Sequence, residues 1–302
     1  MDSHSSSPAG QTDAMQGSSI AGIIGPIVVA VLVGLAVAGD SIDRAGLPAV
    51  VWCVIIAFAV NWVVFVHSWI TRSELYFDLT GSLTYISVTV LAVILADERS
   101  AATWLMAALI LTWATRLGTF LFGRIRADGK DGRFDKIKTD FLRLLMTWTL
   151  QGLWVSLTAI AAWTAITRVG GAEIGVLTWI GLAVWLLGFA IEVQADRQKS
   201  AFKADPANDG RFISTGLWAW SRHPNYFGEI TLWVGMALIA LPSLSGWSYF
   251  ALISPVFVTI LLTQISGVPM LERRGLKRWG DEPAYQRYLE QTPSLILRPP
   301  RS

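Results

Sequence analysis

Apolar residues occur along this chain in long runs, and polar residues gather between the runs instead of alternating with them. The runs lie at roughly 20–38, 47–70, 79–96, 101–122, 141–167, 174–193, 226–243 and 247–265. A hydrocarbon core near 30 Å needs about 20 helical residues, and a helix satisfies its own backbone hydrogen bonds in lipid. The pattern predicts an all-α, polytopic transmembrane helix bundle of about eight spans, with seven spans as the alternative.

The N-terminal segment and the last two apolar runs depart from this pattern. Residues 1–19 are rich in Ser, Gly, Gln and Ala and contain no Lys or Arg, a composition that predicts a disordered tail. Residues 20–302 are expected to form one transmembrane domain. Its last two spans should form a hairpin, because Pro242 and the Ser- and Gly-rich stretch 243–246 interrupt the apolar sequence.

The distribution of basic residues predicts the orientation in the membrane. One face receives twenty Lys and Arg, from Arg72, 124–143, 194–225 and the tail after 271. The other face receives three, Arg44, Arg99 and Arg168, while Arg116 lies inside a span. Because basic loops stay on the cytosolic side, both termini are expected to be cytosolic. The membrane would be a bacterial inner membrane, or the endoplasmic reticulum in a eukaryote.

Composition argues against several classes of function. The net charge of +2 argues against nucleic acid as a partner. One cysteine provides no disulfide framework. The three histidines are scattered and have no helical i, i+4 spacing, so no metal site is expected. The expected partners are the lipid bilayer and a lipophilic small-molecule substrate.

One loop is unusually polar and continues into an apolar run. Glu192 and Asp196 lie one turn apart, Lys203, Arg211 and Arg222 supply cations, and Glu229 falls in the first turn of the next span. A helix N-terminus beside cations is an anion site. Lys203 and Arg211 could alternatively anchor lipid headgroups, and Arg116 could snorkel to the interface. The headgroup alternative does not account for a carboxylate at Glu229, which is costly inside a span.

Four stretches together resemble the steroid 5-alpha-reductase-like proteins, and most closely their DUF1295 branch. They read GLWAWSRHPNYFGE at 216–229, RLGTFLFGRIRADGKDGRF at 116–134, FAIEVQADRQKSAFK at 189–203 and SGVPMLERRGLKRWGDEPAYQRY at 266–288. The R-H-P-x-Y-x-G core alone is less specific, since isoprenylcysteine carboxyl methyltransferases carry a similar one over S-adenosylmethionine. As a set, the four stretches point to the reductase branch.

The resemblance implies NADPH as the cofactor, bound by about 110–290. The family's Asn-x-x-Gly-Glu element matches Asn225, Gly228 and Glu229, and its intramembrane Arg matches Arg116. The full set of expected cofactor-binding residues is Arg116, Asp196, Lys203, Arg211, Arg222, His223, Asn225, Tyr226, Gly228, Glu229 and Arg273. We expect four of them, Arg116, Asp196, Asn225 and Glu229, to converge on one cavity open to the cytosol.

The leading hypothesis for function is a membrane reductase that uses NADPH on an activated C=C bond of a lipophilic, steroid-like or other enone substrate. Tyr85, Tyr76, Tyr226 and His67 are candidates for the donor that binds the substrate carbonyl. Steroid reductases have a Tyr where this chain has Trp113, which cannot act as an acid. Two alternatives stay open: an S-adenosylmethionine-dependent lipid methyltransferase, and a non-catalytic lipid-binding membrane protein.

Overall fold

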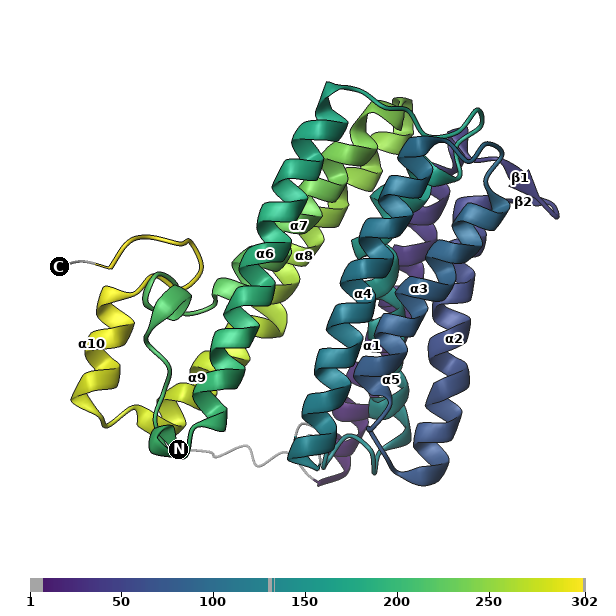
Figure 1. The fold of residues 1–302 in the computed structure, drawn as a ribbon. Coiled ribbons are helices and arrows are strands. Elements are labelled where there is room, and N and C mark those ends of the chain that lie inside the picture. The colour runs from purple at the N-terminus through teal and green to yellow at the C-terminus, as the bar shows by residue number, and fades with distance from the viewer. Residues whose placement is uncertain (1–7, 130–131, 133, 301–302) are drawn as a thin grey trace, which may run out of the picture. The chain divides into compact units, whose positions relative to one another are not determined.

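The protein is an all-α chain in the computed structural model, which describes residues 8–129, 132 and 134–300. The helices of Figure 1 are α1 (Pro8–Ala36), α2 (Ala49–Thr71), α3 (Phe77–Leu95), α4 (Ala101–Asp128), α5 (Phe141–Ile166), α6 (Val176–Ala204), α7 (Pro224–Ala240), α8 (Ile253–Ile260), α9 (Gly267–Trp279) and α10 (Pro283–Gln291). The antiparallel pair β1 (Asp43–Arg44) and β2 (Leu47–Pro48) forms a short hairpin before α2.

Eight stretches within the described residues are long and apolar enough to cross a membrane. The last is continuous from Gly246 to Trp279 and contains a π-helical turn at Leu261–Ile265 between α8 and α9. Pro242 lies in the 3₁₀ turn that separates this stretch from α7, as the sequence predicts for a hairpin. The predicted class, a polytopic transmembrane bundle of eight spans, is confirmed.

The first helix extends further than expected. Where composition predicted a disordered tail over 1–19, α1 begins at Pro8, and residues 1–7 lie outside the described residues. Proline at the first position of a helix is favourable, since its φ angle is preset and its missing N–H is not needed there. The Ala, Gln and Met residues that follow are good helix formers, and the disorder expected for the tail stays a prediction.

The helices group into two compact units, and each unit is built from two separate segments of the chain. The first unit comprises 1–173 with 243–251, and the second comprises 174–242 with 252–302. The single domain predicted over 20–302, with its cofactor-binding part, stays a prediction.

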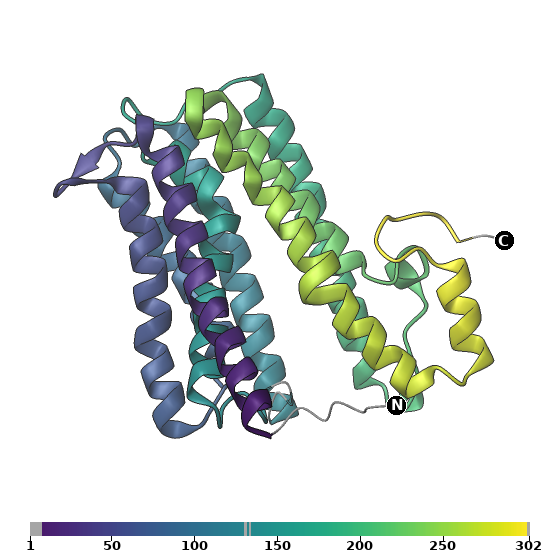
Figure 2. The same cartoon turned by 180° about the vertical axis from the view of Figure 1, so that it is seen from behind.

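The first unit is a bundle of α1 to α5 in which α5 packs against α1, α2 and α3 (Figure 2). Every residue of α5 from Val155 to Ile166 is buried, so this half of the helix is the core of the unit. Its buried polar groups pair across helices: the Trp163 indole donates to Thr89 Oγ1 over 3.0 Å. Capping side chains begin two helices, because Ser100 and Asp140 accept backbone N–H bonds at α4 and α5.

The second unit is built on the close packing of α6 and α7. A Cβ atom added to Gly188 would lie 2.4 Å from Leu232 N and 2.6 Å from Gly228 O. Gly181 and Gly235 oppose each other in the same way, one heptad along each helix. Only glycine allows the two backbones to approach this closely, a device common between membrane helices. The pair fixes where the N-terminus of α7 lies against α6.

Candidate functional site

The loop before α7 is attached to α6 by side chains on both sides. Leu217 N donates to Gln198 Oε1 over 2.9 Å, and the Trp218 indole donates to Ala195 O over 3.0 Å. The Lys199 ammonium lies 4.5 Å from the centre of the Trp218 ring, a cation–π distance. The loop therefore reaches the start of α7 in a fixed position rather than as a free linker.

Helix α7 begins with His223 at its N-cap and Pro224 at its first position. The His223 backbone N–H donates to Ser221 Oγ over 3.1 Å. Ser221 Oγ in turn donates to Leu295 O over 2.8 Å, and Arg222 N donates to Pro293 O over 2.9 Å. We call residues 293–298 the tail strap, because this segment lies along 220–222 and hydrogen-bonds to their backbone and side chains.

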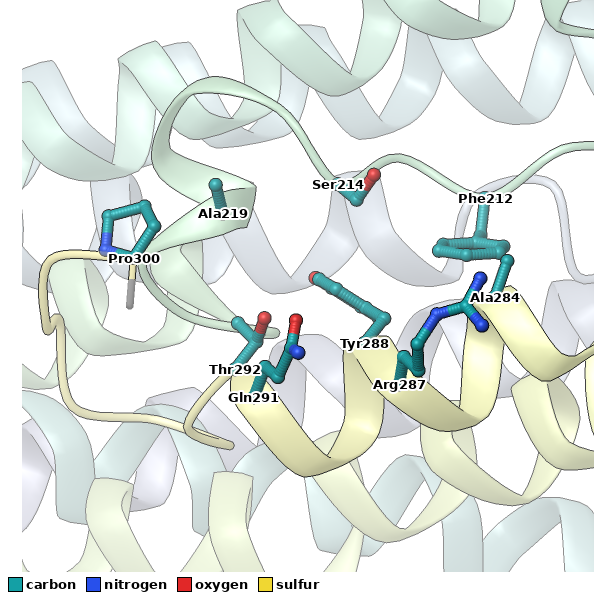
Figure 3. Close-up of a pocket in the computed structure, with 9 residues that line it drawn as sticks. All are labelled: Phe212, Ser214, Ala219, Ala284, Arg287, Tyr288, Gln291, Thr292 and Pro300. Carbon is teal, nitrogen blue, oxygen red and sulfur yellow. The ribbon is translucent and has the colours of Figure 1, made fainter. Parts of the chain in front are cut away.

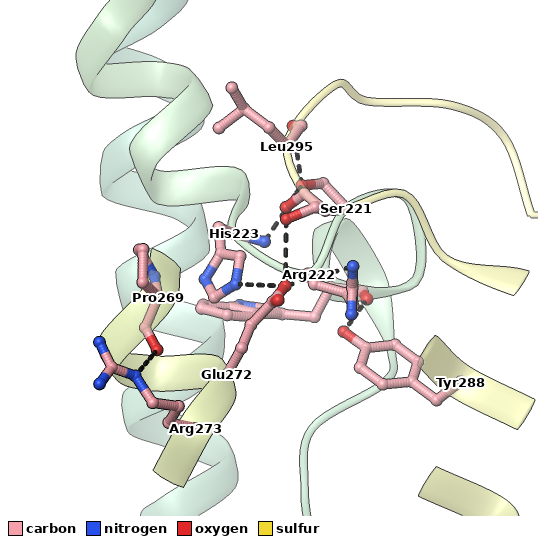
Figure 4. A network of polar contacts seen from close by, with 10 residues as sticks. Ser221, Arg222, His223, Pro269, Glu272, Arg273, Tyr288 and Leu295 are labelled. Carbon is pink, nitrogen blue, oxygen red and sulfur yellow. Dashed lines mark hydrogen bonds and ion pairs between the residues drawn. The ribbon is translucent and has the colours of Figure 1, made fainter. Parts of the chain in front are cut away.

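One carboxylate lies beside three polar side chains at this point (Figure 4). Glu272 Oε1, on α9, lies 3.2 Å from Arg222 Nη2 and 3.5 Å from His223 Nε2. It also accepts a hydrogen bond from Ser294 Oγ over 3.1 Å. Glu272 thus connects α9, the tail strap and the start of α7, and its charge is balanced by Arg222.

His223 is neutral in this environment. Its side chain is almost completely buried, and burial lowers the pKa of His223 to about 4, with further lowering by Lys199 and Arg222 that Glu272 opposes only in part. The nearby Tyr288 hydroxyl donates to Trp218 O over 2.7 Å, and burial raises the pKa of Tyr288. Neither side chain carries charge near pH 7, so the ionic groups of the network are Arg222 and Glu272.

Two buried acceptors at this helix start have no hydrogen-bond partner among the described residues. They are Asn225 Oδ1 and one nitrogen of the His223 ring, since neither ring nitrogen makes a hydrogen bond within the described part of the chain; Nε2 lies beside Glu272 at 3.5 Å, which leaves Nδ1 as the acceptor. Buried acceptors are normally satisfied, and leaving one unpaired costs roughly 1–3 kcal/mol. A ligand with N–H or O–H groups would satisfy them, which makes the first turn of α7 a candidate binding site.

Three buried carboxylates lie on the same pair of helices. Glu192, Asp196 and Glu229 are each less than 10% exposed, and each is engaged in interactions within the described structure. A Cβ added to Gly228 would lie 2.6 Å from Glu192 N, so Gly228 and Glu192 are level with each other. One turn further, toward the start of α7 and the end of α6, Asn225 is therefore level with Asp196.

Residues 64–292 match the family model described as a protein of unknown function, DUF1295. This chain belongs to the DUF1295 family. A Schizosaccharomyces pombe (strain 972 / ATCC 24843) protein described as uncharacterized is 34% identical over 115 residues, covering 30% of this chain and 33% of the relative. The match therefore spans about a third of that curated relative. No solved structure matches the chain.

Membership of DUF1295 confirms the branch that the four sequence stretches indicated, and the structure brings only some of their residues together. Arg222, His223, Asn225 and Tyr226 adjoin one another, and the Tyr226 ring stacks on His223 at 5.7 Å between ring centres. Arg273 is exposed and donates to Pro269 O of its own helix over 3.2 Å, directed away from Glu272 (Figure 4). Lys203 and Arg211 are also exposed.

The remaining candidates of this DUF1295 chain lie in the first unit. The Arg116 guanidinium lies 5.2 Å from the Phe120 ring centre, and its convergence with Asp196, Asn225 and Glu229 stays a prediction. Tyr85 is buried with its ring edge-on to Trp113 at 5.1 Å. His67 and Tyr76 are exposed and contact each other at 5.6 Å. The catalytic roles expected for Tyr85, Tyr76 and His67 stay predictions.

The second unit also contains an open pocket of about 320 Å³ between α10 and the loop 212–219 (Figure 3). Its polar lining comes from Ser214, Arg287, Tyr288, Gln291 and Thr292. Tyr288 connects the pocket to the network of Figure 4, since its hydroxyl donates to Trp218 O. The pocket and the network of Figure 4 thus share Tyr288.

Sequence reasoning missed four residues of the network: Ser221, Glu272, Tyr288 and Ser294. Three of them lie inside stretches that carry the family resemblance, but helical spacing does not relate them to His223. The available signal was Glu272 itself, an acid directly after the last span and before two arginines. Its role depends on how α9 and the tail strap return to the start of α7, which is a tertiary property.

Proposed function

We propose that this protein is a membrane-embedded reductase that uses NADPH on an activated C=C bond of a lipophilic compound. The observation that carries the proposal is the pair of unpartnered buried acceptors, His223 Nδ1 and Asn225 Oδ1, at the start of α7. Membership of DUF1295 supports it, because the same stretch of sequence resembles the NADPH-binding element of steroid 5-alpha-reductase-like proteins.

The residues present fit one end of such a cofactor. A nicotinamide amide or a ribose hydroxyl donates the hydrogen bonds that Asn225 Oδ1 and His223 Nδ1 lack. Buried carboxylates at Asp196 and Glu229 provide further acceptors on the same helices. The exposed cations Lys203 and Arg211 suit the phosphate groups, which need a polar environment outside the hydrocarbon.

When bound, NADPH supplies hydride; the protein supplies orientation and exclusion of water. Asn225 and Glu229 would hold the amide and ribose of the cofactor, and the close α6–α7 contact holds both residues in place. Arg222, neutralised by Glu272, contributes hydrogen bonds more than net charge. Trp113 stands where steroid reductases have Tyr, so the proposed substrate class is enones in general rather than steroids.

The proposed orientation follows the charge distribution. Both termini and the loops 123–140 and 194–225 face the cytosol, where NADPH is available, because twenty basic residues lie on that side and three on the other. Reporter fusions at Lys130 and Ser302 should both report a cytosolic location. A split result would contradict the arrangement of spans.

An S-adenosylmethionine-dependent methyltransferase is the second candidate, and one observation favours it. Glu272 neutralises Arg222, which leaves less positive charge at the start of α7 than a phosphorylated ligand would prefer. The methionine ammonium group of S-adenosylmethionine could instead donate to the unpartnered acceptors. The two functions differ in the ligand that must stabilise the folded protein.

The decisive experiment is thermal unfolding of purified protein with NADPH, NADH or S-adenosylmethionine. A ligand at 100 times its Kd adds about 2.7 kcal/mol to the free energy of unfolding. We expect NADPH to stabilise the protein most. Stabilisation by S-adenosylmethionine alone would overturn the reductase proposal in favour of the methyltransferase.

Two substitutions test which residues bind the phosphate end of the cofactor and which bind the part shared by NADPH and NADH. Arg211→Ala should weaken NADPH binding by roughly ten- to a hundredfold, the loss of one charge-assisted bond to phosphate, and leave NADH binding nearly unchanged. Glu229→Gln should weaken both, because it is placed near the part that the two nucleotides share. Lys277→Ala, an exposed cation on α9, is the matched control and should change neither.

A further inference from the structure

The polar contacts of His223 specify which of its two ring nitrogens carries the proton. Neither ring nitrogen makes a hydrogen bond within the described residues, but Nε2 lies 3.5 Å from the Glu272 carboxylate, and among these residues no such charged group is found at Nδ1. A lone pair on Nε2 would face a negative charge, whereas an N–H at that position is attracted to it. A neutral imidazole has one donor and one acceptor nitrogen, so protonated Nε2 leaves Nδ1 as an acceptor.

The carboxylate that imposes this choice is itself held in place. Glu272 Oε1 accepts from Ser294 Oγ over 3.1 Å and pairs with Arg222 Nη2 at 3.2 Å. Ser294 belongs to the tail strap, whose backbone also binds Ser221 and, through Ser221, the N–H of His223. The imidazole is further fixed by the parallel ring of Tyr226. Its orientation is therefore determined from α7, α9 and the tail strap together.

We propose that Glu272 is a positioning residue that sets the Nε2–H tautomer of His223, so that Nδ1 accepts a hydrogen bond from an N–H or O–H group of the ligand. This inference deepens the proposed function and rests on it only in requiring that a ligand binds at the start of α7. It assigns this spot to a hydroxyl, amide or ammonium group and excludes a phosphate oxygen, which cannot donate. The phosphate groups of the cofactor must then lie away from His223 Nδ1.

The test begins with protein that has no ligand. Imidazole ¹⁵N chemical shifts distinguish the two tautomers, and the chain has only three histidines, so His4→Gln and His67→Gln assign the remaining signals to His223. We expect the Nε2–H tautomer near pH 7. Glu272→Leu, which removes the carboxylate, should give a mixture of tautomers. Glu290→Gln, at an exposed carboxylate of α10, is the control and should leave the signals unchanged.

The second arm adds NADPH or S-adenosylmethionine to the labelled protein. The Nδ1 signal should move in the direction of an accepted hydrogen bond with whichever ligand binds. Glu272→Leu should weaken that ligand by about two- to tenfold, as expected for one neutral hydrogen bond. If Glu272→Leu does not fold, the tautomer of the ligand-free wild type and the change of its Nδ1 signal with ligand still test whether Nδ1 is the acceptor.

The outcomes separate this inference from the proposed function. Binding of S-adenosylmethionine with an Nδ1 response would overturn the reductase and support the role of Glu272. An Nδ1–H tautomer in the free protein would overturn the role of Glu272, whichever ligand binds. Binding of a ligand without any change at Nδ1 would overturn it as well.

Discussion

The two units of this protein bury polar groups in different ways. In the first, buried atoms without a hydrogen-bond partner among the described residues are spread over several helices, as Asn61 Oδ1 on α2 and Gln151 Oε1 on α5 are. Other buried groups there are paired, as Trp163 is with Thr89 and the acid Glu74 is with Lys138 at 3.0 Å. In the second, one carboxylate, Glu272, lies beside three polar side chains. There, unpartnered buried atoms occur on neighbouring residues at one helix start, among them His223 Nδ1 and Asn225 Oδ1.

The difference distinguishes polar contacts that hold helices together from a cluster of unsatisfied groups at one helix start. A Trp–Thr bond joins two helices, and its free energy contributes to the stability of the fold. An unpartnered buried acceptor costs free energy, and one ligand would satisfy two neighbouring acceptors together. The comparison therefore favours the start of α7 over the first unit as a binding site.

The largest expected effect is on the scaffold of the second unit. Gly188→Leu would force a side chain against Leu232 N and Gly228 O, where even a Cβ would be at 2.4 and 2.6 Å. Backbone cannot yield as a side chain can, so we expect unfolding of this unit, with a loss of at least about 3 kcal/mol. Thermal unfolding and ligand binding measure it. Gly25→Leu on α1, where nothing lies within 4 Å of a Cβ, should be tolerated.

The next effect depends on pH and tests whether His223 is buried as a neutral base. The unfolded chain binds a proton at this histidine near pH 6.5, and the folded pKa is about 4. The unfolded state thus binds more protons between these values. The contribution of His223 to the free energy of unfolding, on the order of 3 kcal/mol, is fully present above pH 6.5 and is lost as the pH falls toward 4.

Unfolding measured across this pH range in His223→Gln isolates the contribution, because carboxylates titrate in the same range in both proteins. The variant should lose much of the pH dependence. His67→Gln, at an exposed histidine, should keep it. An unchanged profile in His223→Gln would mean that this imidazole is not buried as a neutral group.

Much of the fold was predictable because the membrane imposes a simple rule on length and polarity. Eight apolar runs became eight helices, and Pro242 marked a real interruption. The first turn of α7 was also predictable, since Glu229 is costly in a span and His223-Pro224 is a natural helix start. The contacts of Glu272, Ser221 and Ser294 with the start of α7 were not predictable, because they depend on tertiary packing of α9 and the tail strap against residues distant in the sequence. α1 begins at Pro8, within the predicted tail, and the disorder of that tail stays a prediction.

A smaller effect is expected at the ion pair of Glu74 and Lys138 in the first unit. Lys138→Met would remove one cationic partner of buried Glu74, whose side chain is 6% exposed, although the Lys138 side chain is 23% exposed. Breaking a fully buried pair costs 3–5 kcal/mol, and partial exposure should reduce this to about 1–2 kcal/mol. Ligand-induced stabilisation should be unchanged. Lys136→Met, at an exposed neighbouring lysine, is the control for the loss of one charge.

The smallest effect is expected inside the core of the first unit. Thr89→Val keeps the shape of the side chain and removes the acceptor of the Trp163 indole. Hydrogen bonds between membrane helices average about 0.6 kcal/mol in double-mutant cycles, so we expect a loss of that size. A cycle with Trp163→Phe isolates the coupling from the change in ring size. Because this bond is complete within the protein, Thr89→Val should leave the affinity for NADPH or S-adenosylmethionine unchanged. A ligand affinity that falls with Thr89→Val would contradict a purely structural role for this bond.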